Sequence, residues 1–145
     1  MTKYLTALAV VSAGLFVVTA GAPCLNAQIT NPIQAHIDHS FVIGDKVLPP
    51  GDYTFRLEGN SNLGVMDVQN RSGDNVAQFT VRQSVDTRRP RHSELVFRRY
   101  GNTEFLSKIY EGGTRHGVAV TENSKEETQL MQSGQHAMEH TEEEK

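Results

Sequence analysis

Short runs of alternating apolar and polar residues, separated by turn-forming residues, constrain the fold of this chain more than any other feature. The first run covers residues 33–43 and has an apolar residue or a histidine at every second position: Ile33, Ala35, Ile37, His39, Phe41 and Ile43. This period of two is typical of a strand with one buried face. Further runs cover residues 53–57, 63–68, 76–83, 95–100, 103–110 and 117–120. Six or seven short strands without helical patterns between them predict an all-β fold, either an antiparallel sandwich or a small barrel.

Glycines mark the turns between these runs. Pro50-Gly51 predicts a type II turn in which Gly51 has a positive φ, and Gly73 lies in the loop of a predicted hairpin. Gly101-Asn102 predicts a two-residue hairpin between the two runs on either side of it. The register of this hairpin places an ion pair beside an apolar pair. The paired residues are Phe97 with Leu106, Arg98 with Phe105 and Arg99 with Glu104.

The N-terminal residues 1–27 have the pattern of a secretory signal peptide. Lys3 provides a positive start, residues 5–18 form an apolar segment, and small residues precede the expected cleavage after Ala27. We therefore expect an exported protein, in the periplasm, the outer envelope or the extracellular space. Its mature chain would begin at Gln28 and would have no membrane span.

Two alternatives to cleavage after Ala27 remain open. Cys24 follows the apolar segment, as a lipid-modified cysteine does, but Pro23 occupies the position where lipoprotein signals have a small residue. An uncleaved anchor is disfavoured because the apolar segment is shorter than the roughly 20 residues that span a bilayer. Removal of Cys24 with the signal would leave a chain without thiols or disulfides.

The C-terminal residues 122–145 differ in character from the chain before them. Ser124 is suited to cap a short helix, and residues 133–145 have almost no apolar content. This end carries seven acidic residues and two lysines, whereas residues 28–121 carry 10 acidic and 11 basic residues. We expect a signal peptide at 1–27, a β domain at 28–121, and a short C-terminal helix with an acidic, disordered tail at 122–145.

The composition excludes several classes of protein. The 145 residues have a mean hydropathy of -0.44 and 21% charged residues, which argues against an integral membrane protein and against a wholly disordered chain. The formal net charge is -3. Because nucleic-acid binders usually carry a cationic surplus, we expect no nucleic-acid partner.

No catalytic or cofactor-binding motif is present. Asp38, His39 and Ser40 are the residue types of a serine hydrolase triad, but neighbours on a strand point to opposite faces and cannot converge on one atom. The chain contains no nucleophile elbow, zincin helix, phosphate-binding loop or dinucleotide-binding glycine pattern. We therefore assign no catalytic residue and no cofactor, and we expect a protein that is not an enzyme.

Histidines offer two incomplete metal sites. His36 and Asp38 share one face of their predicted strand, but a structural site usually needs four ligands, and the sequence places no others nearby. His136 and His140 would chelate a metal if the tail were helical, because residues at this spacing share a helix face. An exposed polar face and a solvated tail explain the same residues, so we assign no metal ligand.

A group of arginines between residues 82 and 99 is the clearest electrostatic feature. It contains six arginines against two carboxylates, those of Asp86 and Glu94. Because the planar guanidinium matches phosphate, sulfate and carboxylate groups, this segment is a candidate anion-binding site for a glycan, lipid or protein surface. The alternative is that the arginines pair with carboxylates of the chain itself, including its acidic C-terminal end. The candidate residues are Arg88, Arg89, Arg91 and Arg98.

Two segments resemble those of a known family. Residues 41–55 read FVIGDKVLPPGDYTF, and residues 95–110 read LVFRRYGNTEFLSKIY. They are similar to the Leu-Pro-x-Gly-x-Tyr element and the Arg-Tyr-Gly...Phe-Leu hairpin of small, exported, functionally uncharacterised β-rich bacterial proteins of acidobacterial type. Pro50 and Tyr110 stand where that family usually has Ala and Trp, which disturbs neither the turn nor the apolar hairpin. The resemblance implies an exported β-rich fold and no catalytic residue.

The sequence thus predicts an exported, non-catalytic binding or envelope-associated module that contacts an anionic glycan, lipid or protein through its arginine-rich segment. The alternative is a structural protein that self-associates through an unpaired sheet edge. An unrecognised enzyme would require His36, Asp38 and a further polar side chain to meet in a concave pocket.

Overall fold

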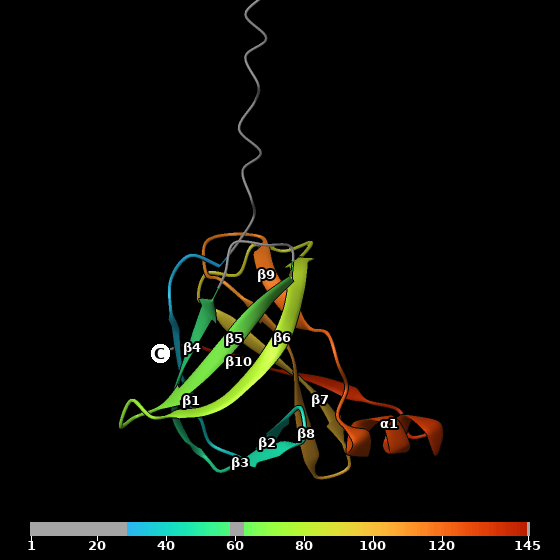
Figure 1. The fold of residues 1–145 in the computed structure, drawn as a ribbon. Coiled ribbons are helices and arrows are strands. Elements are labelled where there is room, and N and C mark those ends of the chain that lie inside the picture. The colour runs from blue at the N-terminus through green and yellow to red at the C-terminus, as the bar shows by residue number, and fades with distance from the viewer. Residues whose placement is uncertain (1–28, 59–62, 145) are drawn as a thin grey trace, which may run out of the picture.

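The computed structural model describes residues 29–58 and 63–144, which form a mostly β structure with one short helix (Figure 1). In chain order the elements of these residues are β1 (Ile33–Ile37), β2 (Phe41–Ile43), β3 (Lys46–Leu48), β4 (Gly51–Glu58), β5 (Leu63–Asn70), β6 (Asn75–Val85), β7 (Glu94–Tyr100), β8 (Thr103–Tyr110), β9 (His116–Val120), α1 (Lys125–Gln132) and β10 (Met138–Glu143). The expected signal peptide at residues 1–27, with Cys24, lies outside the described residues.

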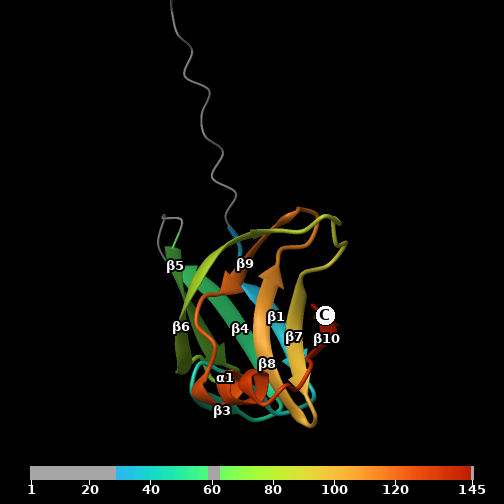
Figure 2. The same cartoon turned by 90° about the vertical axis from the view of Figure 1, so that its right-hand side faces the viewer.

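The strands build one open sheet that is mixed but largely antiparallel. Neighbouring strands follow the order β1-β4-β5-β6-β9-β8-β2-β3, and β7 pairs with both β8 and β10. The sheet is mixed because β2 runs parallel to the start of β8. Figure 2 shows how the sheet curls, with β10 beside β7. At the opening of the sheet, the backbone N–H of Gln34 on β1 donates to Oε1 of Glu144, 3.3 Å away and directly after β10.

The β-rich fold is confirmed in its coarse form, but the sheet of the described residues is open and has ten strands, not six or seven. The first predicted strand splits into β1 and β2 at residues 38–40. The sequence pattern does not show this break, because the side-chain alternation continues across it. β3 has only three residues. β10 lies in the segment expected to be a disordered tail. It has the sequence MEHTEE, which lacks apolar alternation, and it pairs with β7 through its backbone.

Two of the predicted turns are confirmed and one is wrong. Gly73 has a φ of 89° and Gly101 a φ of 59°, values that favour glycine. Gly51 is not among the glycines with positive φ and begins β4, so the type II turn does not form there. The hairpin of β7 and β8 has the predicted register. Its pairs include Phe97 with Leu106, Arg98 with Phe105 and Arg99 with Glu104.

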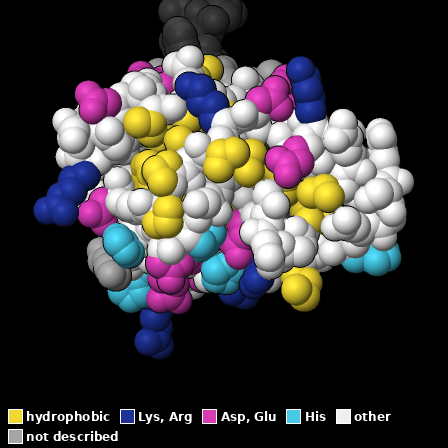
Figure 3. Space-filling model, turned by 90° about the horizontal axis from the view of Figure 1, so that it is seen from below, with side chains coloured by type: hydrophobic (Ala, Val, Ile, Leu, Met, Phe, Trp, Pro, Cys, Tyr) yellow, Lys and Arg dark blue, Asp and Glu magenta, His cyan; other side chains and the backbone are white. Residues whose placement is uncertain are grey.

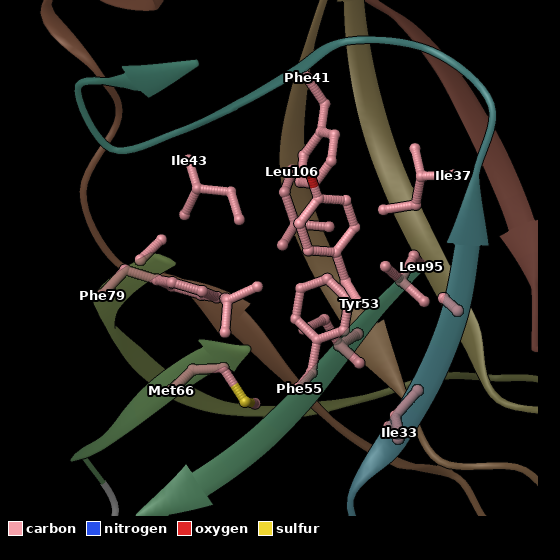
Figure 4. Close-up of a cluster of buried hydrophobic side chains, with 14 of the residues drawn as sticks. Ile33, Ile37, Phe41, Ile43, Tyr53, Phe55, Met66, Phe79, Leu95 and Leu106 are labelled. Atoms are coloured by element: carbon pink, nitrogen blue, oxygen red, sulfur yellow. The ribbon is translucent and has the colours of Figure 1, made fainter. Parts of the chain in front are cut away.

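Aliphatic and aromatic side chains fill the core of the curled sheet (Figure 4). Phe41 and Phe97 are 0% exposed and Phe55 is 1% exposed. The rings of Phe41 and Phe97 meet edge to face, with their centroids 5.7 Å apart. Burying one phenylalanine side chain stabilises a fold by about 1.5–3 kcal/mol. Because Phe41 begins β2, this packing also fixes the short break before it, which carries His39.

The predicted C-terminal helix α1 begins as expected. Oγ of Ser124 accepts a hydrogen bond of 3.0 Å from the backbone N–H of Glu127, which makes Ser124 the N-cap. Oε1 of the same glutamate lies 2.8 Å from Nε of Arg98 on β7. Burial raises the pKa of Glu127, and Arg98 opposes that rise. No helix in the described part of the chain is long and apolar enough to cross a membrane.

Candidate functional site

Two histidines and three carboxylates lie together where the end of β1 meets β8 and β10. We call this group the histidine–carboxylate cluster, and its members are Asp38, His39, Glu104, His140 and Glu142. The side chain of His39 faces inward, as the alternation of the residues around it predicts. His140 and Glu142 are two residues apart on β10 and so share one face of that strand. Figure 3 shows imidazole and carboxylate side chains side by side on the underside of the molecule.

Glu104 is the most buried carboxylate of the cluster. Its side chain is 8% exposed, and its Oε2 lies 2.9 Å from Nε2 of His39. The same oxygen lies 2.9 Å from Nδ1 of His140. On the other side of the carboxylate, Nε of Arg99 lies 3.8 Å from Oε1. Glu104 thus holds the imidazole of His140 in one orientation.

The other nitrogen of His39 faces two further carboxylates. Nδ1 lies 3.1 Å from Oδ1 of Asp38 and 3.1 Å from Oε1 of Glu142. The imidazole ring packs edge-on against the ring of Phe97, with the centroids 5.2 Å apart. The core and the carboxylates therefore determine the orientation of His39 together.

Carboxylates face both nitrogens of His39, whereas Glu104 contacts Nδ1 of His140. An ionised carboxylate only accepts hydrogen bonds, so Nδ1 of His39 donates to Asp38 and Nδ1 of His140 donates to Glu104. In a neutral ring of His140, Nε2 then carries the lone pair. Nε2 of His39 is buried and lies 2.9 Å from Oε2 of Glu104, so a metal ion at this nitrogen would replace that contact. Oε2 of Glu142 is buried and has no hydrogen-bond partner in the described part of the chain.

This arrangement fits a transition-metal ion. One ligand atom from each of His39, His140 and Glu142 lies within 4.8 Å of the other two. Zinc holds nitrogen and oxygen ligands at about 2.0–2.2 Å, so the ligands of one tetrahedral ion are about 3.3 Å apart. Small side-chain rotations would bring the three atoms onto one ion and leave a fourth position open. A carboxylate behind each ligating imidazole is the usual arrangement at such sites.

The two carboxylates beside Nδ1 of His39 differ in proton affinity. Burial raises the pKa of Glu142, and the charges of Asp38 and Glu104 add to the rise, whereas the two histidines of the cluster oppose it. The hydrogen bond with His39 lowers the pKa of the Asp38 carboxyl. Ionising the Glu142 carboxyl therefore costs free energy in this site, and a bound cation would offset this cost.

The structure separates the first metal pair that the sequence suggests. His36 does not join Asp38, because Nδ1 of His36 lies 2.7 Å from Oδ1 of Asp52 on β4. Asp38 and His39 meet instead, against the expectation from strand geometry, since residues 38–40 form a break between β1 and β2.

The second suggested pair also takes another form. His140 lies on a strand, so the helical spacing that would join it to His136 does not apply. Sequence reasoning placed Glu104 opposite Arg99 in the hairpin, but it identified neither Glu104 nor Glu142 as a site residue. The His-x-Glu spacing of His140 and Glu142 was the available signal, but it points to one shared face only when the tail is read as a strand.

Two of the four candidate anion-binding arginines pair with carboxylates of the chain. Nη2 of Arg88 lies 3.0 Å from Oδ2 of Asp86 and 3.1 Å from Oε2 of Glu94. Arg98 pairs with Glu127 of α1. Arg88 and Arg98 thus make the contacts expected if the arginines pair with carboxylates of the chain itself and not with an external anion.

The other two arginines lie free on the surface. Arg89 and Arg91 are exposed and have no ion pair within the described residues. Both lie in the loop between β6 and β7, whereas Arg98 lies towards the opposite end of β7. Two of the four candidate residues are therefore cations without an ion pair in the described part of the chain, two positions apart in one loop.

Comparison with protein-family models, with curated proteins and with solved structures found no match to this chain. The resemblance to exported acidobacterial proteins stays a prediction that depends on residues 41–55 and 95–110. What the histidine–carboxylate cluster can do follows from its own geometry.

Proposed function

We propose that the protein is an exported, non-catalytic module that binds one divalent transition-metal ion, zinc by preference, at the histidine–carboxylate cluster. The observation that carries this proposal is that one ligand atom from each of His39, His140 and Glu142 lies within 4.8 Å of the other two. An unsatisfied buried polar group costs roughly 1–3 kcal/mol. One metal ion would satisfy Oε2 of Glu142, which is buried and has no hydrogen-bond partner in the described residues. Imidazole and carboxylate donors together suit zinc better than calcium or magnesium, which prefer oxygen ligands alone.

The bound ion would have a structural task. His39 follows β1, while His140 and Glu142 lie on β10, so the ligands come from the two sides of the opening in the sheet. Every residue of β10 is exposed or half-buried, and the side chain of Met138 is 64% exposed. A metal bridge would therefore hold a strand that hydrophobic packing holds only weakly.

Calorimetric titration of the chelator-treated protein is expected to show one zinc ion bound per chain and much weaker binding of magnesium. His136→Ala is the matched control, because His136 is an exposed histidine that precedes β10 and lies outside the cluster. This variant should bind zinc as the unaltered protein does. Failure to bind zinc, or equal loss of binding in His136→Ala, would contradict the proposal.

Zinc affinity is expected to depend on pH through Glu142. Because the pKa of Glu142 is raised, a proton competes with the metal for this carboxylate at pH values above those at which glutamate usually titrates. Affinity should fall as the pH falls through that raised pKa, and Glu142→Gln should remove this part of the pH dependence. In the metal-free protein, the raised pKa means that the contribution of Glu142 to stability is present in acid and lost as the pH rises through it. Titrations at several pH values measure the first effect, and identical pH profiles for both proteins would refute it.

A second candidate function is favoured by the free arginines of the β6–β7 loop. Arg89 and Arg91 are exposed cations without a carboxylate partner in the described residues, which suits contact with an anionic glycan, a lipid headgroup or an acidic protein surface. Asp86 supports this loop by accepting a hydrogen bond of 3.0 Å from the backbone N–H of Arg88. The loop thus presents two guanidinium groups without an ion pair in the described residues, next to a residue whose backbone Asp86 holds.

The double variant Arg89→Ala/Arg91→Ala is expected to elute from a heparin column at clearly lower salt than the unaltered protein, because it loses both free cations. Arg82→Ala removes one exposed arginine from β6, outside this loop, and is the control. The control should shift elution less. Equal shifts for the two variants would mean that net charge alone determines retention.

A further inference from the structure

A shallow hollow of about 480 Å³ lies on the outer face of the sheet, away from the histidine–carboxylate cluster and the arginine loop. It is formed by β1, β4, β5 and the turn after β5. Its volume lies within the range of about 300–1,000 Å³ that is usual for small-molecule sites.

The strand register places three uncharged polar side chains in one row across this hollow. Gln34 on β1 lies opposite Thr54 on β4, and Thr54 lies opposite Gln69 on β5. All three residues are exposed or half-buried. Their side chains make no hydrogen bond within the described residues, so two amides and one hydroxyl can donate to and accept from a ligand.

A second row beside the first carries charge. Nδ1 of His36 lies 2.7 Å from Oδ1 of Asp52, and Nη1 of Arg71 lies 3.7 Å from Oδ2 of the same aspartate. The side chain of Arg71 is 87% exposed, which leaves most of its guanidinium accessible. One guanidinium beside one carboxylate gives little net charge, and this disfavours a ligand whose charges lie close together, such as a polyphosphate.

We propose that this hollow binds an acidic saccharide. The ligand carboxylate would pair with Arg71 in the planar fork geometry that guanidinium groups favour, and its ring hydroxyls would bond to Gln34, Thr54 and Gln69. The ring of Tyr53 also lines the hollow, but it is 6% exposed and its hydroxyl donates to the backbone oxygen of Pro49. Recognition therefore depends on hydrogen bonds and one ion pair, not on stacking.

Trigalacturonate, titrated into the ¹⁵N-labelled protein, tests this proposal through amide chemical shifts. We expect shifts at β1, β4 and β5, with the fully methyl-esterified trisaccharide binding at least about tenfold more weakly because its carboxyl groups carry no charge. Arg71→Ala and Gln34→Ala/Gln69→Ala should each weaken trigalacturonate binding at least about tenfold. Arg56→Ala is the matched control, because Arg56 is an exposed arginine of β4 that does not line the hollow, and it should bind as the unaltered protein does.

Several results would overturn the proposal. One is the absence of shifts at the three strands. Another is binding that Arg89→Ala/Arg91→Ala abolishes while Arg71→Ala leaves it intact, which would place the ligand on the β6–β7 loop. Unchanged binding in Gln34→Ala/Gln69→Ala would mean that the charge of Arg71 alone holds the ligand. Repeating the titration with zinc and with a chelator should give the same affinity, because the hollow contains no residue of the histidine–carboxylate cluster.

Discussion

His39→Ala is expected to lower the zinc affinity of the protein at least about 100-fold. The substitution removes one of the three ligands of the proposed site. It also removes the ring that joins Glu104 on one side to Asp38 and Glu142 on the other. Without this ring, His140 and Glu142 remain as two ligands on one strand, and two ligands hold zinc poorly.

His36→Ala is the matched control for this experiment. His36 lies on β1, three residues before His39, but its imidazole is exposed and pairs with Asp52. Zinc affinity should stay within about twofold of that of the unaltered protein, since no ligand is lost. Competition with a fluorescent chelator gives both affinities. Equal affinities for His39→Ala and the unaltered protein would refute the assignment of the cluster.

Phe97→Ala is expected to lower the free energy of unfolding by about 3–5 kcal/mol. Phe97 is 0% exposed, and its ring meets the ring of Phe41 at a centroid distance of 5.7 Å. The same ring packs against His39 at 5.2 Å. The substitution therefore leaves a cavity in the core and also loosens the imidazole, so zinc affinity should fall together with stability.

Urea unfolding of the chelator-treated protein measures the loss of stability. Phe97→Leu keeps most of the buried volume and should cost clearly less than Phe97→Ala. A loss below about 1 kcal/mol for Phe97→Ala would mean that Phe97 does not occupy a packed core position.

The hairpin of β7 and β8 shows what local sequence can predict. Gly101-Asn102 determines a two-residue turn, and the turn determines the register on both sides of it. Alternation likewise predicts the buried face of β1 and of β6, but not of β7 and β8, in which consecutive residues are buried. In the same way it places His39 on the inward side, although the break at residues 38–40 is invisible to a period of two.

The histidine–carboxylate cluster shows where such reasoning ends. β10 has no apolar alternation, and its position depends on backbone pairing with β7, a strand about 40 residues earlier in the chain. The contact of His140 with Glu104 spans a separation of 36 residues. No local pattern encodes a contact of this kind. The ligands could therefore be recognised as residue types in the sequence, but not as a group.

The most direct test of the metal site is an anomalous difference map at the zinc absorption edge, from crystals of the protein grown with zinc. The account predicts one peak within bonding distance, about 2.0–2.2 Å, of His39, His140 and Glu142. A map without a peak at these three residues, or with its strongest peak at His36 and Asp52 or at His136, would contradict it.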